Sequence, residues 1–188
     1  MDYISPLDDD TLPGIERRRD VTPQELLEEY VMKSRPVVLT DTVKDWPAMK
    51  KWTPQYFKER YGAIKHEVKG KVYTIAEQVE LMMHSTMEHP APYPYNLNVD
   101  HVFPELREDM RPPTVFDRVD RLLSPMMPKL LAKGTIKHEL FLSGKGSYFP
   151  ILHVDVQHLH TQITQVYGSK VFFLYAPDQT PYMYPKPE

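Results

Sequence analysis

The first apolar pattern along the chain has the spacing of a helix. Apolar side chains recur on one helical face over residues 26–31, directly after Thr22 and Pro23, and these two residue types suit the N-cap and the first helical position. A proline disfavours helix in the residue before it, so Pro36 should end this helix. The β-branched run over residues 36–40 then predicts a short buried strand.

The same capping pattern indicates two more helices. A Thr-Pro pair at Thr53 opens one of them, and Gly62 stands where a C-terminal glycine cap belongs. Thr74 is followed three residues later by a glutamate, so it opens a helix that should reach about His84. Apolar spacing predicts a further helix over residues 114–123. Two methionines near the end of the helix that starts at Thr74 are expected to fill the core: Met82 and Met83.

The pattern changes near Lys137, where strand-forming residues replace helical spacing. Residues 139–143 and 170–175 have the composition of strands, and the long stretch 152–167 is rich in Thr, Val and Gln. Glycine-containing turns separate these stretches. The C-terminal part of the chain is therefore predicted to be a β-meander.

The predicted fold class is α+β within one domain. Residues 1–136 form a mostly helical region with a short strand near 36–40, and residues 137–188 carry most of the sheet. A chain of 188 residues with 41% hydrophobic residues is large enough to build one sizeable core.

Charge and composition exclude several classes of partner and site. Lys and Arg number 23 against 26 Asp and Glu, and the net charge of -3 gives no general attraction for nucleic acid or anionic membranes. No stretch approaches the roughly 18 consecutive apolar residues of a membrane-spanning helix, and residues 1–10 are acidic, unlike a signal peptide. The absence of cysteine excludes disulfides and thiolate metal sites. We expect a cytoplasmic protein without nucleic-acid or membrane partners.

The triplet His153-Val154-Asp155 is the strongest chemical signal in the sequence. On a strand, residues two apart project from the same face with Cα atoms roughly 7 Å apart. An imidazole nitrogen and a carboxylate oxygen can then bind one ion, and two histidines with one carboxylate form the open site of non-haem iron(II) oxygenases. An isolated His-x-Asp is weak evidence, because a strand-end His and Asp can equally pair with each other or with solvent.

The residues around the triplet make a metal-binding role for it more specific. Residues 144–155 combine a glycine turn, a proline and His-x-Asp; residues 161–170 combine a polar strand-like stretch with Gly-x-Lys; and residues 171–179 form an apolar run that ends in a proline-led polar turn. This order resembles the Jumonji C, cupin-like family of iron(II)- and 2-oxoglutarate-dependent oxygenases. Three upstream stretches resemble the N-terminal part of the same family: 35–39, 45–48 and 51–53.

The resemblance implies roles for individual residues. His153 and Asp155 fall on the first two iron ligands, Lys170 on the residue that binds the distal carboxylate of 2-oxoglutarate, and Thr161 on a cosubstrate contact. Tyr95 matches a family tyrosine only loosely, so we expect a core residue there. The implied cofactors are Fe(II), 2-oxoglutarate and O2, and the implied activity is hydroxylation of a protein side chain or a small molecule. The resemblance points to no further catalytic residue.

The resemblance also implies the first strands of a cupin-like jelly roll over residues 137–188, with the barrel incomplete. The family's second histidine ligand lies well beyond the Gly-x-Lys turn, and no histidine follows His160 here. We therefore expect the third ligand beyond residue 188, and the chain alone to be inactive. His158 or His160 could serve instead only through a bulge, because both have the opposite strand parity to His153.

Two other functions remain open. A non-catalytic cupin-like binding module would explain a missing third ligand. A metal-dependent cupin enzyme of another class could use His158 and His160, although the glutamate that usually follows such a pair is absent. No histone-reading module is apparent, so hydroxylation is expected rather than demethylation. The sequence leaves the substrate and the oligomeric state undecided.

Overall fold

The computed structural model describes residues 14–114, 138–155 and 160–183. These residues belong to two compact units. One unit contains residues 14–44 and 168–183, and the other contains residues 45–114, 138–155 and 160–167. Both units mix helices with small sheets, as the α+β prediction requires. Apart from Thr114, the helix expected over 114–123 lies outside the described residues, as does His158.

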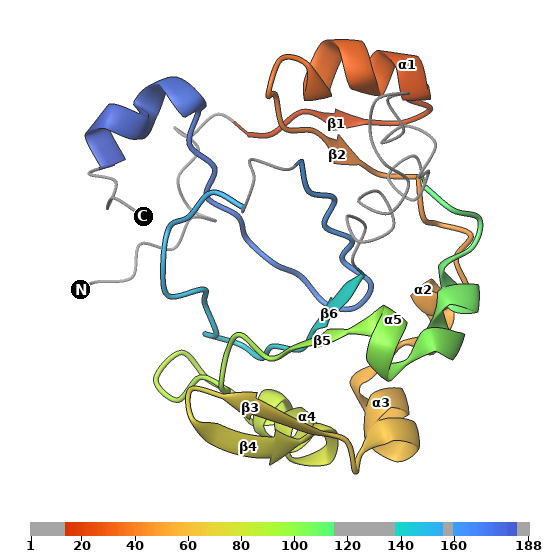
Figure 1. The fold of residues 1–188 in the computed structure, drawn as a ribbon, viewed down its shortest axis with the longest axis vertical. Coiled ribbons are helices and arrows are strands. Elements are labelled where there is room, and N and C mark those ends of the chain that lie inside the picture. Colours follow the sequence, from red (N-terminus) through yellow and green to blue (C-terminus); the bar gives the residue numbers. More distant parts are fainter. Residues whose placement is uncertain (1–13, 115–137, 156–159, 184–188) are drawn as a thin grey trace, which may run out of the picture. The chain divides into compact units, whose positions relative to one another are not determined.

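The first unit contains a helix beside a short parallel strand pair (Figure 1). Its elements are β1 (Arg17–Arg18), α1 (Pro23–Glu25), the π-helical turn η1 (Leu26–Val31), β2 (Val38–Leu39) and the 3₁₀ helix η6 (Pro177–Met183). The hydroxyl of Thr22 accepts a hydrogen bond of 3.1 Å from the Glu25 N–H, so the predicted cap is confirmed. β2 falls within the predicted strand, but it is half-buried instead of buried.

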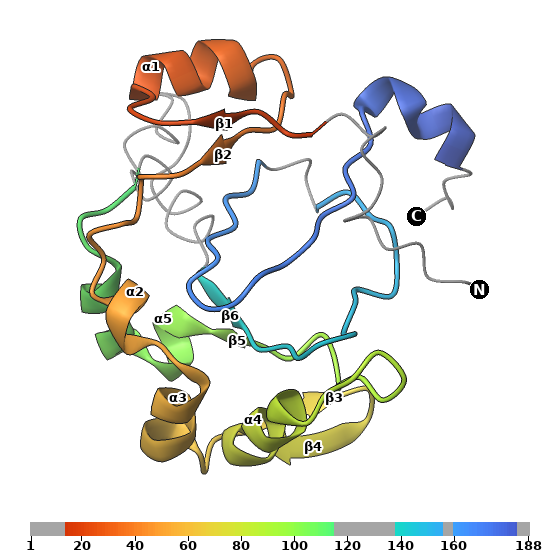
Figure 2. The same ribbon diagram turned by 180° about the vertical axis from the view of Figure 1, so that it is seen from behind.

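The second unit contains most of the regular structure. Its elements in chain order are α2 (Ala48–Lys51), α3 (Pro54–Tyr61), β3 (Lys65–Val68), β4 (Lys71–Thr74), α4 (Ile75–Met83), β5 (Asn96–Asn98), α5 (Val99–Val102), the 3₁₀ helix η2 (Pro104–Met110) and β6 (Glu139–Phe141). β3 and β4 form an antiparallel hairpin, and β5 pairs antiparallel with β6. Both ribbon views show α4 lying alongside the hairpin (Figures 1 and 2). No helix in the described part of the chain has both the length and the apolar character needed to cross a membrane.

The predicted helix starts in this unit are confirmed by their caps. Thr53 accepts a hydrogen bond of 3.1 Å from the Tyr56 N–H at the start of α3. Thr74 and Glu77 form a reciprocal capping box at the start of α4, which satisfies two N–H groups that the helix itself leaves unpaired. Gly62 ends α3 in a right-handed conformation, with φ of −54°.

The core of this unit lies where α3 and α4 meet β5, α5 and η2. Fully or almost fully buried side chains include Phe57, Ile75, Val79, Tyr95, Leu97, Phe103 and Leu106. Met83, which the sequence placed in the core, is 64% exposed, and that prediction was wrong.

The β-meander predicted for the C-terminal part is mostly not formed. Among the described residues after 137, only Glu139–Phe141 lie in a strand, and residues 142–155 and 160–176 contain none. The strand predicted over 170–175 is therefore wrong, and its apolar side chains are 43–58% exposed. A strand needs a hydrogen-bonded neighbour and a covered apolar face to be stable, and the apolar side chains of residues 171–175 are exposed.

Asp109 links two elements of the larger unit that lie far apart in sequence. Its carboxylate accepts hydrogen bonds of 2.7 and 2.9 Å from Lys51 Nζ and of 2.9 Å from the indole N–H of Trp52. Asp109 is only 8% exposed and Trp52 only 6%. A charged group buried to this degree is tolerated because it is paired and hydrogen-bonded, so the three residues stabilise the contact between η2 and the end of α2.

We predict that Asp109→Ala lowers the free energy of unfolding by about 2–3 kcal/mol, because it removes charge-assisted bonds and leaves the buried Trp52 N–H without its acceptor. Glu108→Ala is the matched control: its ion pair with Arg111 is exposed, so we expect a change below about 0.5 kcal/mol. Urea unfolding followed by tryptophan fluorescence measures both. Equal effects of the two variants would contradict the assigned role of Asp109.

Candidate functional site

His153 and Asp155 face each other across a segment without regular structure. His153 Nε2 lies 3.5 Å from Asp155 Oδ1, and the two side chains are 42% and 45% exposed. The sequence predicts a strand here, but the described residues around the pair form none. The pairing of the two side chains is nevertheless present, so it must be held by local contacts instead of a strand ladder.

The imidazole of His153 has a second contact that bears on its chemistry. His153 Nδ1 lies 3.4 Å from the carbonyl oxygen of Ile151. A carbonyl and a carboxylate can only accept, so one neutral tautomer donates from Nδ1 to Ile151 and the other donates from Nε2 to Asp155. Only the tautomer with its proton on Nδ1 leaves the Nε2 lone pair available to a metal ion. This is the arrangement in which a histidine binds a metal through Nε2 while its other nitrogen is held by a carbonyl.

Thr161 holds the other oxygen of the carboxylate. Its hydroxyl donates a hydrogen bond to Asp155 Oδ2, so Oδ1 is left facing the histidine. The structure thus brings three of the predicted site residues together: His153, Asp155 and Thr161. The predicted contact of Thr161 with a cosubstrate stays a prediction, and the bond to Asp155 was not foreseen.

The two donors fit neighbouring positions around one metal ion. Bonds of about 2.1 Å are usual for imidazole nitrogen and carboxylate oxygen. Two such bonds at a right angle place the donor atoms about 3 Å apart, and the observed separation of 3.5 Å is within a small side-chain adjustment of this value. Imidazole and carboxylate are also donors that suit iron(II).

A third protein ligand is not present beside the pair in the described residues. No group of three His, Cys, Asp or Glu with metal-binding geometry occurs in residues 14–114, 138–155 and 160–183. His160 is described and forms no such group with His153 and Asp155, whereas His158 lies outside the described residues.

Lys170 belongs to the other unit. It is exposed, and its ammonium lies 5.2 Å from the centroid of the Phe172 ring. The preceding Gly168 has a φ of +75°, a backbone conformation that glycine adopts readily, and this agrees with the predicted turn. The role of Lys170 toward 2-oxoglutarate stays a prediction.

Tyr95 is a core residue, as expected. It is completely buried, its ring packs edge-on against His66 at 5.1 Å, and its hydroxyl donates to the Tyr73 carbonyl at 3.5 Å. Burial raises the pKa of Tyr95 to about 12, because the charged phenolate would be poorly solvated there. This tyrosine therefore stays neutral at any physiological pH.

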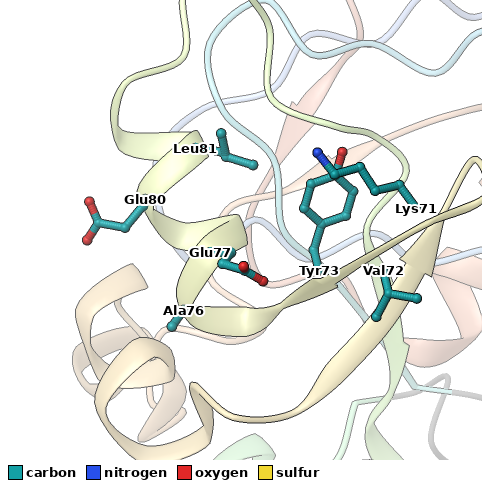
Figure 3. A pocket seen from close by; sticks show the side chains of 7 residues that line it. All are labelled: Lys71, Val72, Tyr73, Ala76, Glu77, Glu80 and Leu81. Carbon is teal, nitrogen blue, oxygen red and sulfur yellow. The ribbon is translucent and has the colours of Figure 1, made fainter.

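A surface groove between β4 and α4 has a volume of about 440 Å³, and Figure 3 shows the side chains that line it. Its charged groups already have partners within the chain. Glu77 accepts hydrogen bonds from Thr74, which lower the pKa of Glu77, and Lys58 lowers the pKa of Glu80 by a direct ion pair. Lys71, the third charged residue of the groove, lies over the Tyr73 ring at 4.9 Å from its centroid. The His153–Asp155 pair places two metal-binding donor atoms 3.5 Å apart and is the better candidate site.

Sequence reasoning missed two groups at the site. One is the Ile151 carbonyl, which no residue pattern reveals. The other is Phe149, whose ring centroid lies 4.6 Å from that of His153. An aromatic residue four positions before a candidate ligand was a signal that could have drawn attention to it.

Two comparisons with known proteins bear on this chain. It is 24% identical over 174 residues to the lysine-specific demethylase JMJ21 of Arabidopsis thaliana, and this match covers 89% of the chain but only 18% of the plant protein. The chain thus spans less than a fifth of the length of that relative. The family model for the cupin-like domain matches residues 23–188, which include the helical region and the His153–Asp155 pair. The chain therefore belongs to the cupin-like domain family.

Proposed function

We propose that this chain carries part of the metal site of an iron(II)- and 2-oxoglutarate-dependent oxygenase. The observation that carries the proposal is the His153–Asp155 pair, whose Nε2 and Oδ1 atoms face each other at 3.5 Å. The family assignment and the match to a demethylase support the same class of activity.

Each residue has a defined task in this proposal. His153 Nε2 and Asp155 Oδ1 bind the metal, the Ile151 carbonyl keeps the proton on His153 Nδ1, and Thr161 holds the second carboxylate oxygen. Lys170 pairs with the distal carboxylate of 2-oxoglutarate, as a compact cation with three donors can. When bound, iron(II) with 2-oxoglutarate supplies activation of O2 for oxidation of a substrate C–H bond.

The third ligand of a two-histidine, one-carboxylate site has to come from outside the described residues. Among the described residues after 137, only Glu139–Phe141 form a strand. We further propose that residues 137–188 form the first strands of a cupin-like jelly roll only when a partner strand pairs with them, so that this ligand belongs to a neighbouring strand of the same barrel. The exposed apolar side chains of residues 171–175 agree with such a barrel, because they are the kind of surface that a facing sheet would cover.

The substrate is proposed to be a protein side chain or a small molecule. Demethylation of N-methyl-lysine is a second candidate, favoured by the name of the plant relative, and it needs the same oxidation of a C–H bond. Incubation with unmodified and methylated lysine peptides, read by mass spectrometry, separates the two: hydroxylation adds an oxygen mass, whereas demethylation removes a methyl group.

A non-catalytic cupin-like binding module is the competing function. The exposed pair without a third ligand among the described residues favours it. The two functions differ in a measurable way, because a binding module would neither need iron(II) nor consume 2-oxoglutarate. The proposed cytoplasmic location and the absence of nucleic-acid and membrane partners apply to either.

We predict that His153→Ala and Asp155→Ala each weaken Mn(II) binding in the full-length protein at least about 10-fold and abolish succinate release, because each removes a direct ligand. Asp155→Glu should impair turnover as well, since it keeps the charge but moves the carboxylate by one methylene. Mn(II) affinity is measured by electron paramagnetic resonance, and succinate by coupled assay. His89→Ala, at an exposed histidine far from the pair in sequence, is the control. Wild-type affinity in both alanine variants would refute the metal site.

We predict that Lys170→Ala raises the apparent KM for 2-oxoglutarate by roughly 10- to 100-fold, because loss of a charge-assisted bond costs about 1.5–3 kcal/mol. Mn(II) affinity should not change, because Lys170 is not proposed to touch the metal. Lys33→Ala serves as the control, since Lys33 is an exposed lysine that pairs with Glu29. An unaltered KM in Lys170→Ala would assign the carboxylate contact to another cation.

A further inference from the structure

Three aromatic rings lead from the core of the larger unit to the candidate site. Tyr93 is buried, with 5% exposure, and its ring meets that of Phe149 edge-on at 6.1 Å and 82°. The ring of Phe149 also contacts the imidazole of His153, at 4.6 Å and an interplanar angle of 34°. Phe149 therefore lies between a fixed core residue and the candidate metal ligand.

Hydrogen bonds hold the backbone just before Phe149 in place. The hydroxyl of Ser147 donates to the Ala91 carbonyl at 2.9 Å. The hydroxyl of Ser85 accepts from the Ala91 N–H at 2.7 Å and donates to the Lys145 carbonyl at 2.6 Å. These bonds join the turn at 144–147 to the chain that follows α4.

Two glycines make this close approach possible. At Gly144 a Cβ would lie 2.8 Å from the Met82 carbonyl oxygen, and at Gly146 a Cβ would lie 2.8 Å from the Met87 Cα, both too close for a side chain. Gly146 also has a φ of +77°, which other residues adopt only with strain. The turn before Phe149 is therefore packed tightly against residues 82–87, and the start of the His153 segment is fixed.

Beyond this turn the segment is exposed, so His153 depends on its own contacts for orientation. An imidazole that is 42% exposed can rotate about its side-chain bonds unless neighbours restrict it. Besides Asp155, two contacts among the described residues restrict it: the Ile151 carbonyl at Nδ1 and the ring of Phe149. Together they leave Nε2 directed at Asp155.

We propose that Phe149 is a positioning residue for His153: in contact with Tyr93 on one side and with the imidazole on the other, it holds Nε2 in the direction required for metal binding. Phe149 does not touch the metal and acts only through His153. The consequence for metal affinity rests on the proposed function, whereas the orientation of the imidazole does not.

The test compares Phe149→Leu, Phe149→Tyr and the control Tyr148→Leu in the full-length protein. Leucine keeps an apolar side chain but removes the ring, whereas tyrosine keeps the ring. Tyr148 is the adjacent aromatic residue and is 72% exposed. Three quantities are measured in each variant: the His153 ring proton shifts in the metal-free protein by nuclear magnetic resonance, the Mn(II) dissociation constant, and the thermal unfolding midpoint.

The proposal expects Phe149→Leu to remove the ring-current shift of the His153 protons and to raise the Mn(II) dissociation constant about 10- to 100-fold, as loss of ligand support does. Phe149→Tyr should retain both properties, and Tyr148→Leu should change neither. The unfolding midpoint should not follow the loss of affinity, because a positioning role differs from a general stabilising one.

Other outcomes overturn the proposal. Unchanged His153 shifts in Phe149→Leu would show that the ring does not orient the imidazole. Changed shifts with wild-type Mn(II) affinity would show that the orientation is irrelevant to binding. An equal loss in Tyr148→Leu would assign the effect to the whole segment. Failure of the proposed function can be distinguished from failure of the positioning role. If the proposed function is wrong, His153→Ala will bind Mn(II) like wild type. The ring-proton shifts alone will then decide whether Phe149 orients the imidazole.

Discussion

The candidate site depends on how His153 Nε2 and Asp155 Oδ1 are kept facing each other without a strand beneath them. In a sheet, backbone hydrogen bonds would fix the direction of both side chains. Here the described residues provide side-chain and carbonyl contacts instead: Ile151 at the imidazole, Thr161 at the carboxylate and Phe149 against the ring. Each of these contacts restricts one group, so the pair is arranged by several weak restraints acting together.

The segment that carries these restraints starts beside α4, a helix whose start is specified by local sequence. α4 starts at the capping box of Thr74, and the chain just after its end receives the glycine turn at 144–147 through Ser85. A helix with a defined start and end provides a rigid surface, and the turn packs on it closely enough to exclude a Cβ at Gly144. The less regular segment that carries His153 therefore starts from a fixed point.

Features that depend on residues close together in the sequence could be predicted, whereas features that depend on distant residues could not. Helix caps at Thr22, Thr53 and Thr74 involve residues three positions apart, so the pattern alone identified them. The bond from Trp52 to Asp109 joins residues 57 positions apart, and no local pattern indicates it. The strand prediction was wrong for the same reason. Residues 170–175 have strand composition, but a strand also needs a partner strand, and composition does not identify one.

The arrangement of the His153–Asp155 pair is hard to explain as a stabilising feature. Both side chains are more than 40% exposed, and an ion pair in water contributes at most about 1 kcal/mol while restricting two side chains. A pair that served only folding would gain little from the contacts with Ile151, Thr161 and Phe149, since these hold each group in one orientation at an entropic cost. Such restraint is favourable when a metal ion binds to both groups, because the entropy of ordering the two side chains is then lost before binding and does not weaken the affinity. The restraint on both side chains therefore agrees better with the proposed metal site than with a surface ion pair.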